Sequence, residues 1–418
     1  MRPLALLLVS VLLSQSLQAQ PAISGAWAIT VVDFGLPNTA RLVLKQDGDK
    51  LTGTLGNQAL EGSLAGADIA FKVGNREARG KLTGARLAGQ ITQGGRTLEW
   101  SAERLPPRPA KPRTHKFEPT NFELYFTSRV DPVLRIAPGD TVTTWSVGAD
   151  GVDAKGERRS PGGNPQTGPF YVEGAMPGDT LVVRVNRLRT NRAWAVSGSR
   201  VMPTAVEPGH LASLKWPDSF NSRWTIDTAA GIARLEQPPD ALKNFTVPLR
   251  PMLGCIAVAP GQQWAIRTTD SGRFGGNMDY NELVEGTTVY LPVNHPGALL
   301  FVGDGHAAQG DGELTGDALE TSMDIEFTVE LIEGRNFGHP LFENSEYLIS
   351  VGIGGSLDQA LQMATSGIMR WLDRDYKLGA SEAAVVMGFA IRYDVADLVG
   401  TQVSIAAKLP KSALAKLR

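Results

Sequence analysis

Acidic residues and one histidine are concentrated among glycines between Gly275 and Glu320. Seven titratable residues stand out in this segment: Asp279, Asp304, His306, Asp311, Glu313, Asp317 and Glu320. Glycine lets the backbone turn sharply and approach a ligand closely. Carboxylates and an imidazole supply metal ligands or groups that transfer protons. The segment therefore predicts a metal site or a hydrolytic site.

Asp304 and His306 follow a short apolar run, residues 299–302, as Asp-Gly-His. In an extended chain, residues two apart point to the same side. Both side chains could then reach one ion. The alternative for Asp304 is a structural one, because Asp-Gly is a common turn pair and the carboxylate could cap that turn.

Asp279 follows Gly275, Gly276 and Asn277. Its carboxylate either caps this loop or is a ligand delivered by a tight turn. Asn277 could donate a hydrogen bond to a substrate oxyanion, or it could be a turn residue only.

Asp311-Gly312-Glu313 repeats an acid–glycine–acid spacing. We expect Glu313 to be a metal ligand or an acid/base group, and Asp311 to form the turn. Glu320 begins an alternating segment, where it is either a further ligand or part of a solvated face.

Composition limits the classes of function. The chain has 418 residues, of which 42% are hydrophobic and 20% charged, which is enough for two or three domains. The 41 basic and 43 acidic residues give a net charge of -2, so no basic field predicts a nucleic-acid partner. The 46 glycines and 26 prolines favour a turn-rich β protein.

The N-terminus has the pattern of a secretory signal peptide, residues 1–19. Arg2 precedes an apolar run over residues 4–13, and Ala19 is a small residue at the cleavage position. We expect a periplasmic or secreted protein; a membrane anchor is less favoured because the apolar run is short. No later segment has the pattern of a membrane span, and the single cysteine, Cys255, has the apolar neighbours of a buried thiol.

Residues 21–104 are short alternating segments broken by glycine about every ten residues. Asp-Gly at 47–48 indicates a hairpin. The pattern predicts an antiparallel meander that closes into a small lipocalin-like barrel, with Trp27 and Trp100 in its core. An accessory role is the preferred interpretation, and ligand binding the alternative. Residues 105–120 are Pro-rich and are expected to form a linker with a solvated His115.

From residue 121 the pattern predicts a β-sandwich domain that continues to 418. Pro-Gly-Asp turns at 138–140 and 177–179 separate apolar strands, and residues 323–333 alternate strictly. Residues 356–376 have helical spacing after Ser356 as N-cap. A second helix is expected from residues 379–381 through 394, and a strand closes the chain. The predicted fold class is therefore β-rich α+β.

Three segments resemble the signature of the acetamidase/formamidase family: GGNMDYNELVEGTTVYLPV, PGALLFVGDGHAAQGDGE and GDALETSMDIEF. The resemblance covers roughly residues 120–418. It implies a β-rich fold, assembly into homo-oligomers, and hydrolysis of small amides such as formamide or acetamide to carboxylate and ammonia. It also implies a divalent metal, with zinc expected and calcium or another ion as alternatives. The signal peptide and the first β domain depart from many members and put these two simple substrates in doubt.

Hydrolysis of an amide needs an activated water, a polarised carbonyl and a proton for the departing amine. We expect a metal to be held by Asp279, Asp304, His306 and Glu320. We expect catalysis to involve Asn277, Asp279, His306 and Glu313. The alternatives are a non-catalytic ligand-binding protein on the same fold, or an amidase for a larger or cyclic amide.

Overall fold

The computed structural model describes residues 23–217, 219–415 and 417. The chain forms two compact units: residues up to 104 without 39–41, and residues 105–418 together with 39–41. The expected signal peptide, residues 1–19, lies outside the described residues. None of the described helices is both long and apolar enough to cross a membrane.

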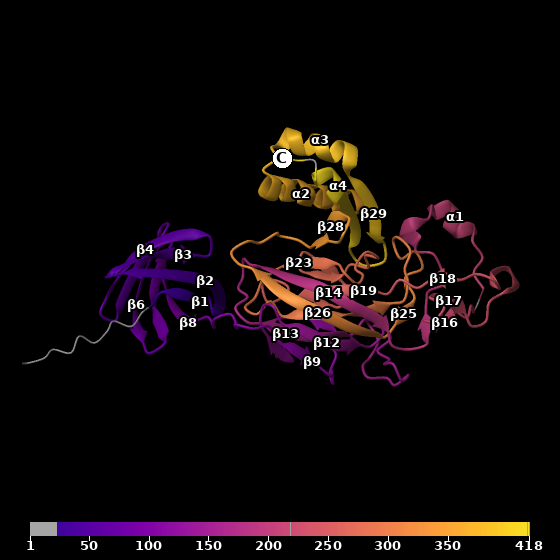
Figure 1. Ribbon diagram of the computed structural model, residues 1–418, viewed down its shortest axis with the longest axis horizontal. Helices are drawn as coiled ribbons and strands as arrows, with labels where there is room; N and C mark the ends of the chain where they lie inside the picture. Colours follow the sequence, from indigo (N-terminus) through magenta and orange to yellow (C-terminus); the bar gives the residue numbers. More distant parts are fainter. Residues whose placement is uncertain (1–22, 218, 416, 418) are drawn as a thin grey trace, which may run out of the picture. The chain divides into compact units, whose positions relative to one another are not determined.

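The first unit is a closed antiparallel barrel, as the sequence predicted (Figure 1). Its strands follow the chain order, and β1 pairs with β8 to close it. The strands are β1 (Gly25–Asp33), β2 (Leu36–Asp47), β3 (Lys50–Leu55), β4 (Gln58–Ala65), β5 (Asp68–Val73), β6 (Arg76–Thr83), β7 (Arg86–Gln93) and β8 (Arg96–Arg104).

Short glycine turns explain the regular spacing of the barrel. Asp47 pairs with Lys50, so Gly48, with a φ of 58°, begins a two-residue hairpin loop. Trp27 and Trp100 are both buried in the barrel, which confirms the prediction for them.

The second unit contains a nine-stranded sheet in the order β29-β30-β28-β27-β23-β14-β26-β12-β9. Its strands are β9 (Thr114–Lys116), β12 (Thr141–Ser146), β14 (Thr180–Thr190), β23 (Thr288–Pro292), β26 (Met323–Ile332), β27 (Leu341–Glu343), β28 (Tyr347–Gly354), β29 (Arg392–Asp397) and β30 (Val403–Pro410). Alternate residues of β26 are buried, as predicted from its pattern.

An eleven-stranded sheet packs against the same apolar core as the nine-stranded sheet. Its main path is β18-β17-β16-β15-β25-β24-β19-β22-β21, and β13 pairs with β24 and β11. Its strands are β11 (Leu134–Ile136), β13 (Gln166–Val172), β15 (Trp194–Val196), β16 (Arg223–Asp227), β17 (Ile232–Leu235), β18 (Val247–Pro248), β19 (Met252–Val258), β21 (Ser271–Gly272), β22 (Gly275–Asn277), β24 (Leu300–His306) and β25 (Glu320–Thr321). Two further short strands, β10 (Tyr125–Phe126) and β20 (Ile266–Arg267), pair with each other.

The two large sheets share one apolar core, so this unit has the expected sandwich architecture. Phe170 of β13 packs edge-on against Phe327 of β26, with ring centroids 5.4 Å apart. Every residue of β19 is buried, including the free thiol of Cys255. Burial raises the pKa of this thiol, which fits the expected inert cysteine.

The two Pro-Gly-Asp turns have the same structure. The Asp140 carboxylate accepts from the backbone N–H of Ala137, and the Asp179 carboxylate accepts from that of Met176. They lead into β12 and β14, the two neighbours of β26.

The C-terminal helices pack beside β28 and β30 (Figure 1). The Ser356 side chain caps α2 by accepting from the backbone N–H of Gln359, as predicted. The helices are α1 (Pro208–Ser213), α2 (Leu357–Tyr376), α3 (Ala380–Ala390) and α4 (Lys411–Leu414), with 3-10 turns at Pro203–Ala205 and Asp240–Leu242.

Three local expectations were wrong. The second C-terminal helix ends at Ala390, and the following residues form β29 because they pair with β30. Residues 114–116, expected in the linker, form β9 in parallel with β12, and His115 is bonded to the buried Asp140 carboxylate at 2.9 Å rather than solvated. The apolar run 299–302 continues as β24 to His306, so Asp304 and His306 lie in the strand, not beyond it.

Candidate metal centre and its cavity

Strand β19 brings the predicted site residues together. It pairs with β22 on one edge and with β24 on the other. The turn after β22 carries Asp279, and β24 carries Asp304 and His306. Strand β23, which lies between these two parts in the sequence, belongs to the other sheet.

Gly254 leaves the space in which these side chains meet. It lies in β19 opposite Asp304, between the pairs Leu253–Gly305 and Cys255–Gly303. A Cβ atom on Gly254 would lie 2.3 Å from Asp304 Oδ2 and 2.4 Å from Asp279 Oδ1. The Gly254 carbonyl also accepts from the backbone N–H of Asp279. Only glycine at this position allows both carboxylates to converge over the strand.

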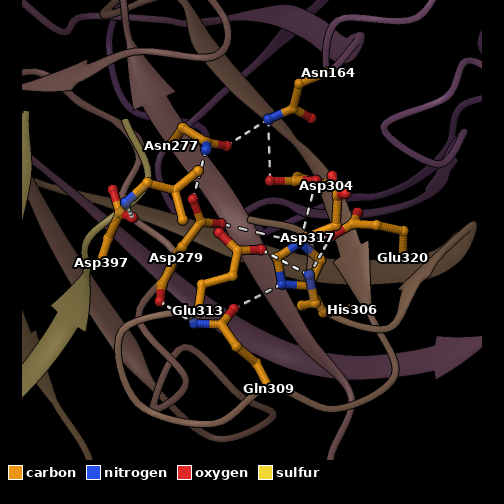
Figure 2. A network of polar contacts seen from close by, with 12 residues as sticks. Asn164, Asn277, Asp279, Asp304, His306, Gln309, Glu313, Asp317, Glu320 and Asp397 are labelled. Carbon is orange, nitrogen blue, oxygen red and sulfur yellow. Dashed lines mark hydrogen bonds and ion pairs between the residues drawn. The ribbon is translucent and has the colours of Figure 1, made fainter. Parts of the chain in front are cut away.

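His306 lies at the centre of the cluster (Figure 2). Its Nε2 is 3.1 Å from Glu320 Oε1, 3.3 Å from Asp304 Oδ1 and 3.9 Å from Asp279 Oδ1. All four side chains are buried. Glu320 lies in β25, which pairs with β24 at His306, so its solvated alternative is wrong.

Gln309 fixes the orientation and the tautomer of His306. The Gln309 Nε2 donates to the backbone carbonyl of Asp279, which can only accept. The Gln309 Oε1 therefore faces His306 Nδ1 at 2.9 Å and accepts its N–H. In the neutral imidazole this leaves the lone pair on Nε2, which points toward the three carboxylates. Such a bond on the other ring nitrogen is typical of histidines that bind metals.

A chain of amides orients two of the carboxylates (Figure 2). Gln166 Nε2 donates to Asn164 Oδ1 at 2.9 Å. Asn164 Nδ2 in turn donates to Asp304 Oδ2 and to Asn277 Oδ1. Asn277 Nδ2 donates to Asp279 Oδ2. This bond uses one of the two Asn277 N–H groups to position Asp279, and the second N–H has no hydrogen-bond partner among the described residues.

Backbone strain is concentrated at this cluster. Among the described residues other than glycine, ten have positive φ, and four of them belong to the site: Asn164 (63°), Asp279 (41°), Asp304 (62°) and Glu313 (48°). This left-handed conformation costs about 1 kcal/mol or more per residue. Strain of this kind persists where the surrounding structure holds side chains in a functional arrangement.

Burial and mutual repulsion raise the pKa values of the acids. Burial, then the carboxylates of Glu313 and Asp304, raise the pKa of Asp279 well above 3.8. Burial likewise raises the pKa of Glu313 and of Glu320. Burial alone would lower the pKa of His306, but the Glu320 and Asp304 carboxylates raise it well above 6.5. Without another cation, the cluster therefore retains protons that a metal ion would displace.

The donor set fits a divalent ion. Two overlapping triads place their ligand atoms within 4.8 Å of one another: Asp304–His306–Glu320 and Asp279–His306–Glu313. Asp279 Oδ1 and Glu320 Oε2 are buried and have no hydrogen-bond partner among the described residues. A buried carboxylate oxygen without a partner is unfavourable, and a bound cation would satisfy it.

The cluster forms the floor of a cavity of about 550 Å³. None of the described residues in its lining is a lysine or an arginine. Seven acidic residues line it: Asp150, Asp270, Asp279, Asp304, Glu313, Asp317 and Glu320. Asp311 is exposed, outside this lining, and accepts from Asn281.

Sequence reasoning missed several residues of the centre. Asp397, at the end of β29, is buried, and burial raises its pKa to about 6. Its Oδ1 accepts from the backbone N–H of Val399, whereas Oδ2 has no partner among the described residues. Gln309 was visible inside the GHAAQGDGE segment, but Gly254, Asn164 and Asp397 lie in segments with no chemical signal of their own.

Residues 261–350 match the model of the Acetamidase/Formamidase family. An acetamidase from Mycolicibacterium smegmatis is 26% identical over 257 residues, which cover 46% of this chain and 62% of the relative. The chain thus matches less than two thirds of that relative's length.

Solved structures extend the similarity to the fold. The acetamidase from Yersinia enterocolitica is 25% identical, with a TM-score of 0.61, and the match covers 73% of this chain and 94% of that protein. A predicted acetamidase/formamidase from Thermoanaerobacter tengcongensis is 24% identical, with a TM-score of 0.63 over 73% of this chain and 99% of its own. These matches confirm the fold class expected from the sequence.

Proposed function

Because this chain belongs to the acetamidase/formamidase family, we propose that it is an amidase, which hydrolyses the carbon–nitrogen bond of a small amide to a carboxylate and ammonia. The observation that carries the proposal is the centre itself. A single imidazole nitrogen is oriented toward buried carboxylates, two of whose oxygens have no partner among the described residues, at the floor of a cavity.

Asp304, His306 and Glu320 are the residues that would hold the ion, because their atoms lie closest together. Three protein ligands leave a position open, as in catalytic zinc sites. When bound, a divalent ion would lower the pKa of a water molecule and polarise the amide carbonyl. The shared Nε2 of His306 has one lone pair, so we expect one ion per chain.

The remaining groups position atoms and move protons. Asp279 Oδ1, which has no hydrogen-bond partner in the described part of the chain, accepts the proton of the attacking water, while Asn277 holds the other oxygen of this carboxylate. Glu313, whose raised pKa favours the protonated carboxyl, delivers a proton to the departing nitrogen. The free N–H of Asn277 donates to the developing oxyanion.

Ammonia release tests this proposal. The protein is assayed with a panel of amides from formamide to pentanamide, loaded in turn with zinc, manganese or calcium, and again after chelation. We expect metal-dependent ammonia release, with zinc the most effective ion because an imidazole ligand favours it.

His306→Ala should remove both the bound metal and the activity. His210→Ala is a matched control, because His210 is exposed in α1. A folded, metal-loaded protein that releases no ammonia from any amide would support the non-catalytic alternative instead. Activity and metal content that survive His306→Ala would refute the assignment of this centre.

Export is a separate proposal. Residues 1–19 have the pattern of a signal peptide, so the enzyme would meet its amide outside the cytoplasm. Cell fractionation of the producing organism tests this, and a protein found only in the cytoplasm with an intact N-terminus would contradict it.

A further inference from the structure

Three acidic residues line the cavity beyond the inner cluster: Asp150, Asp270 and Asp317. Asp270 is joined to the inner cluster through the backbone, because Asn277 N donates to the Asp270 carbonyl at 3.2 Å. Asp317 lies on the loop between Glu313 and Glu320 and is drawn with the cluster in Figure 2. These outer acids belong to the same chamber as the centre.

Two of the outer carboxylates have no cationic partner among the described residues. Asp150 Oδ1 lies 3.8 Å from the buried Arg192 guanidinium. Asp270 accepts only from the Thr401 hydroxyl, and the side chain of Asp317 has no hydrogen bond or ion pair among the described residues. One divalent ion at the inner cluster would not balance these charges, since the three carboxylates of Asp279, Asp304 and Glu320 already exceed its charge.

The cavity is larger than a very small amide requires. Clefts of about 300–1,000 Å³ hold ligands of drug size, and this one has about 550 Å³. Formamide and acetamide have only three and four non-hydrogen atoms. A substrate that uses this space has a longer acyl chain, and its far end meets the outer carboxylates instead of the metal.

We propose that the substrate is a cationic amide, an amide whose acyl chain carries an ammonium group that binds between Asp270 and Asp317. This rests on the proposed amidase function and adds the chemical class of its substrate. Asp279 Oδ1 and Glu320 Oε2, which are buried and have no hydrogen-bond partner among the described residues, would face the reacting end. The outer acids, of which Asp270 is half-buried and Asp317 exposed, would face the charged end.

Isosteric amides test the charge without changing the shape. β-Alaninamide and butyramide differ only in an ammonium group in place of a methyl group, and malonamate has an anionic end. All three release ammonia. We expect kcat/KM to be about tenfold higher for β-alaninamide than for butyramide. The ammonium group would form two solvent-accessible ion pairs, and each such pair raises kcat/KM by up to about fivefold. Malonamate should be the poorest substrate.

Two variants test whether Asp270 and Asp317 cause the preference for the cationic amide. Asp270→Asn and Asp317→Asn should each lower the ratio of kcat/KM for β-alaninamide to that for butyramide by about threefold. Asp240→Asn removes a carboxylate of the exposed 3-10 turn outside the cavity and should leave the ratio unchanged. The preference should also fall with added salt, which screens exposed charges.

The outcomes separate the two proposals. Equal or faster cleavage of butyramide would overturn the cationic substrate but leave the amidase. A cationic preference that both variants retain would overturn the assignment to Asp270 and Asp317. No ammonia from any of the three amides, with metal bound, would overturn the amidase itself.

Discussion

Gly254→Ala is the substitution that the geometry of the centre forbids most clearly. A methyl group at this position would lie 2.3 Å from Asp304 Oδ2, 2.4 Å from Asp279 Oδ1 and 2.8 Å from His306 Cε1. A carbon–oxygen contact needs more than about 3 Å, so the two carboxylates must retreat by roughly 1 Å. They cannot do so separately, because Asn164 donates to the clashing Oδ2 of Asp304, and Asn277 donates to Oδ2 of Asp279.

The expected effect has three parts. A displacement of about 1 Å at a reacting centre lowers catalysis by about 100-fold, and metal affinity should fall with it. Forcing an extra methyl group into a packed site costs about 1–3 kcal/mol of unfolding free energy. Ammonia release, metal content after dialysis and thermal denaturation measure these three effects.

Gly310→Ala is the matched control. Gly310 lies on the loop after His306, has no atom within 4 Å of the position of a new Cβ, and does not have a positive φ. It should retain metal and activity. If Gly254→Ala binds metal and cleaves amides as well as Gly310→Ala does, the convergence of Asp279 and Asp304 over β19 is not what builds the centre.

Two further predictions concern groups around the metal. Gln309→Leu should weaken metal binding by about 10- to 100-fold, because His306 loses the bond that fixes its tautomer; unchanged affinity in a metal titration would show that this bond is incidental. Asp397 has a pKa of about 6 against an ordinary 3.8, so the native state binds its proton more tightly than the unfolded chain does. The Asp397 carboxyl should therefore lower the unfolding free energy of metal-free protein by about 3 kcal/mol as pH rises from about 4 to 6. The raised pKa values of Asp279, Glu313 and Glu320 change the unfolding free energy in the same direction. Asp397→Asn should remove part of this slope in thermal denaturation at pH 4.5 and pH 7; a slope as steep as that of the wild type would contradict the role given to Asp397.

Local patterns predicted much of the fold. Glycine turns spaced about ten residues apart are enough to indicate a barrel, because each two-residue loop sets the register of the next strand. The alternation of β26 and the N-cap of α2 are likewise set by neighbours in sequence. The end of α3 was not predictable in this way, since the pairing of β29 with β30 overrides the apolar helical pattern.

The residues of the site likewise include some that local sequence patterns predict and others that depend on distant strand pairing. Asp304 and His306 are two residues apart on one strand, so their convergence follows from the period of that strand. Asp397 is distant from these residues in sequence, and the bridge that its backbone forms with Gly312 brings it close to the centre. Gly254 matters because it has no side chain, and such a role is visible only when the neighbouring strands are in place.

We infer that one divalent ion at His306 makes this chain an amidase. The most direct measurement adds zinc in steps to chelator-treated protein and follows ammonia release from butyramide at each step. We predict no release without metal, a linear rise, and a plateau at about one ion per chain. Ammonia release that is complete before any metal is added, or that never appears with the metal fully bound, would contradict this account.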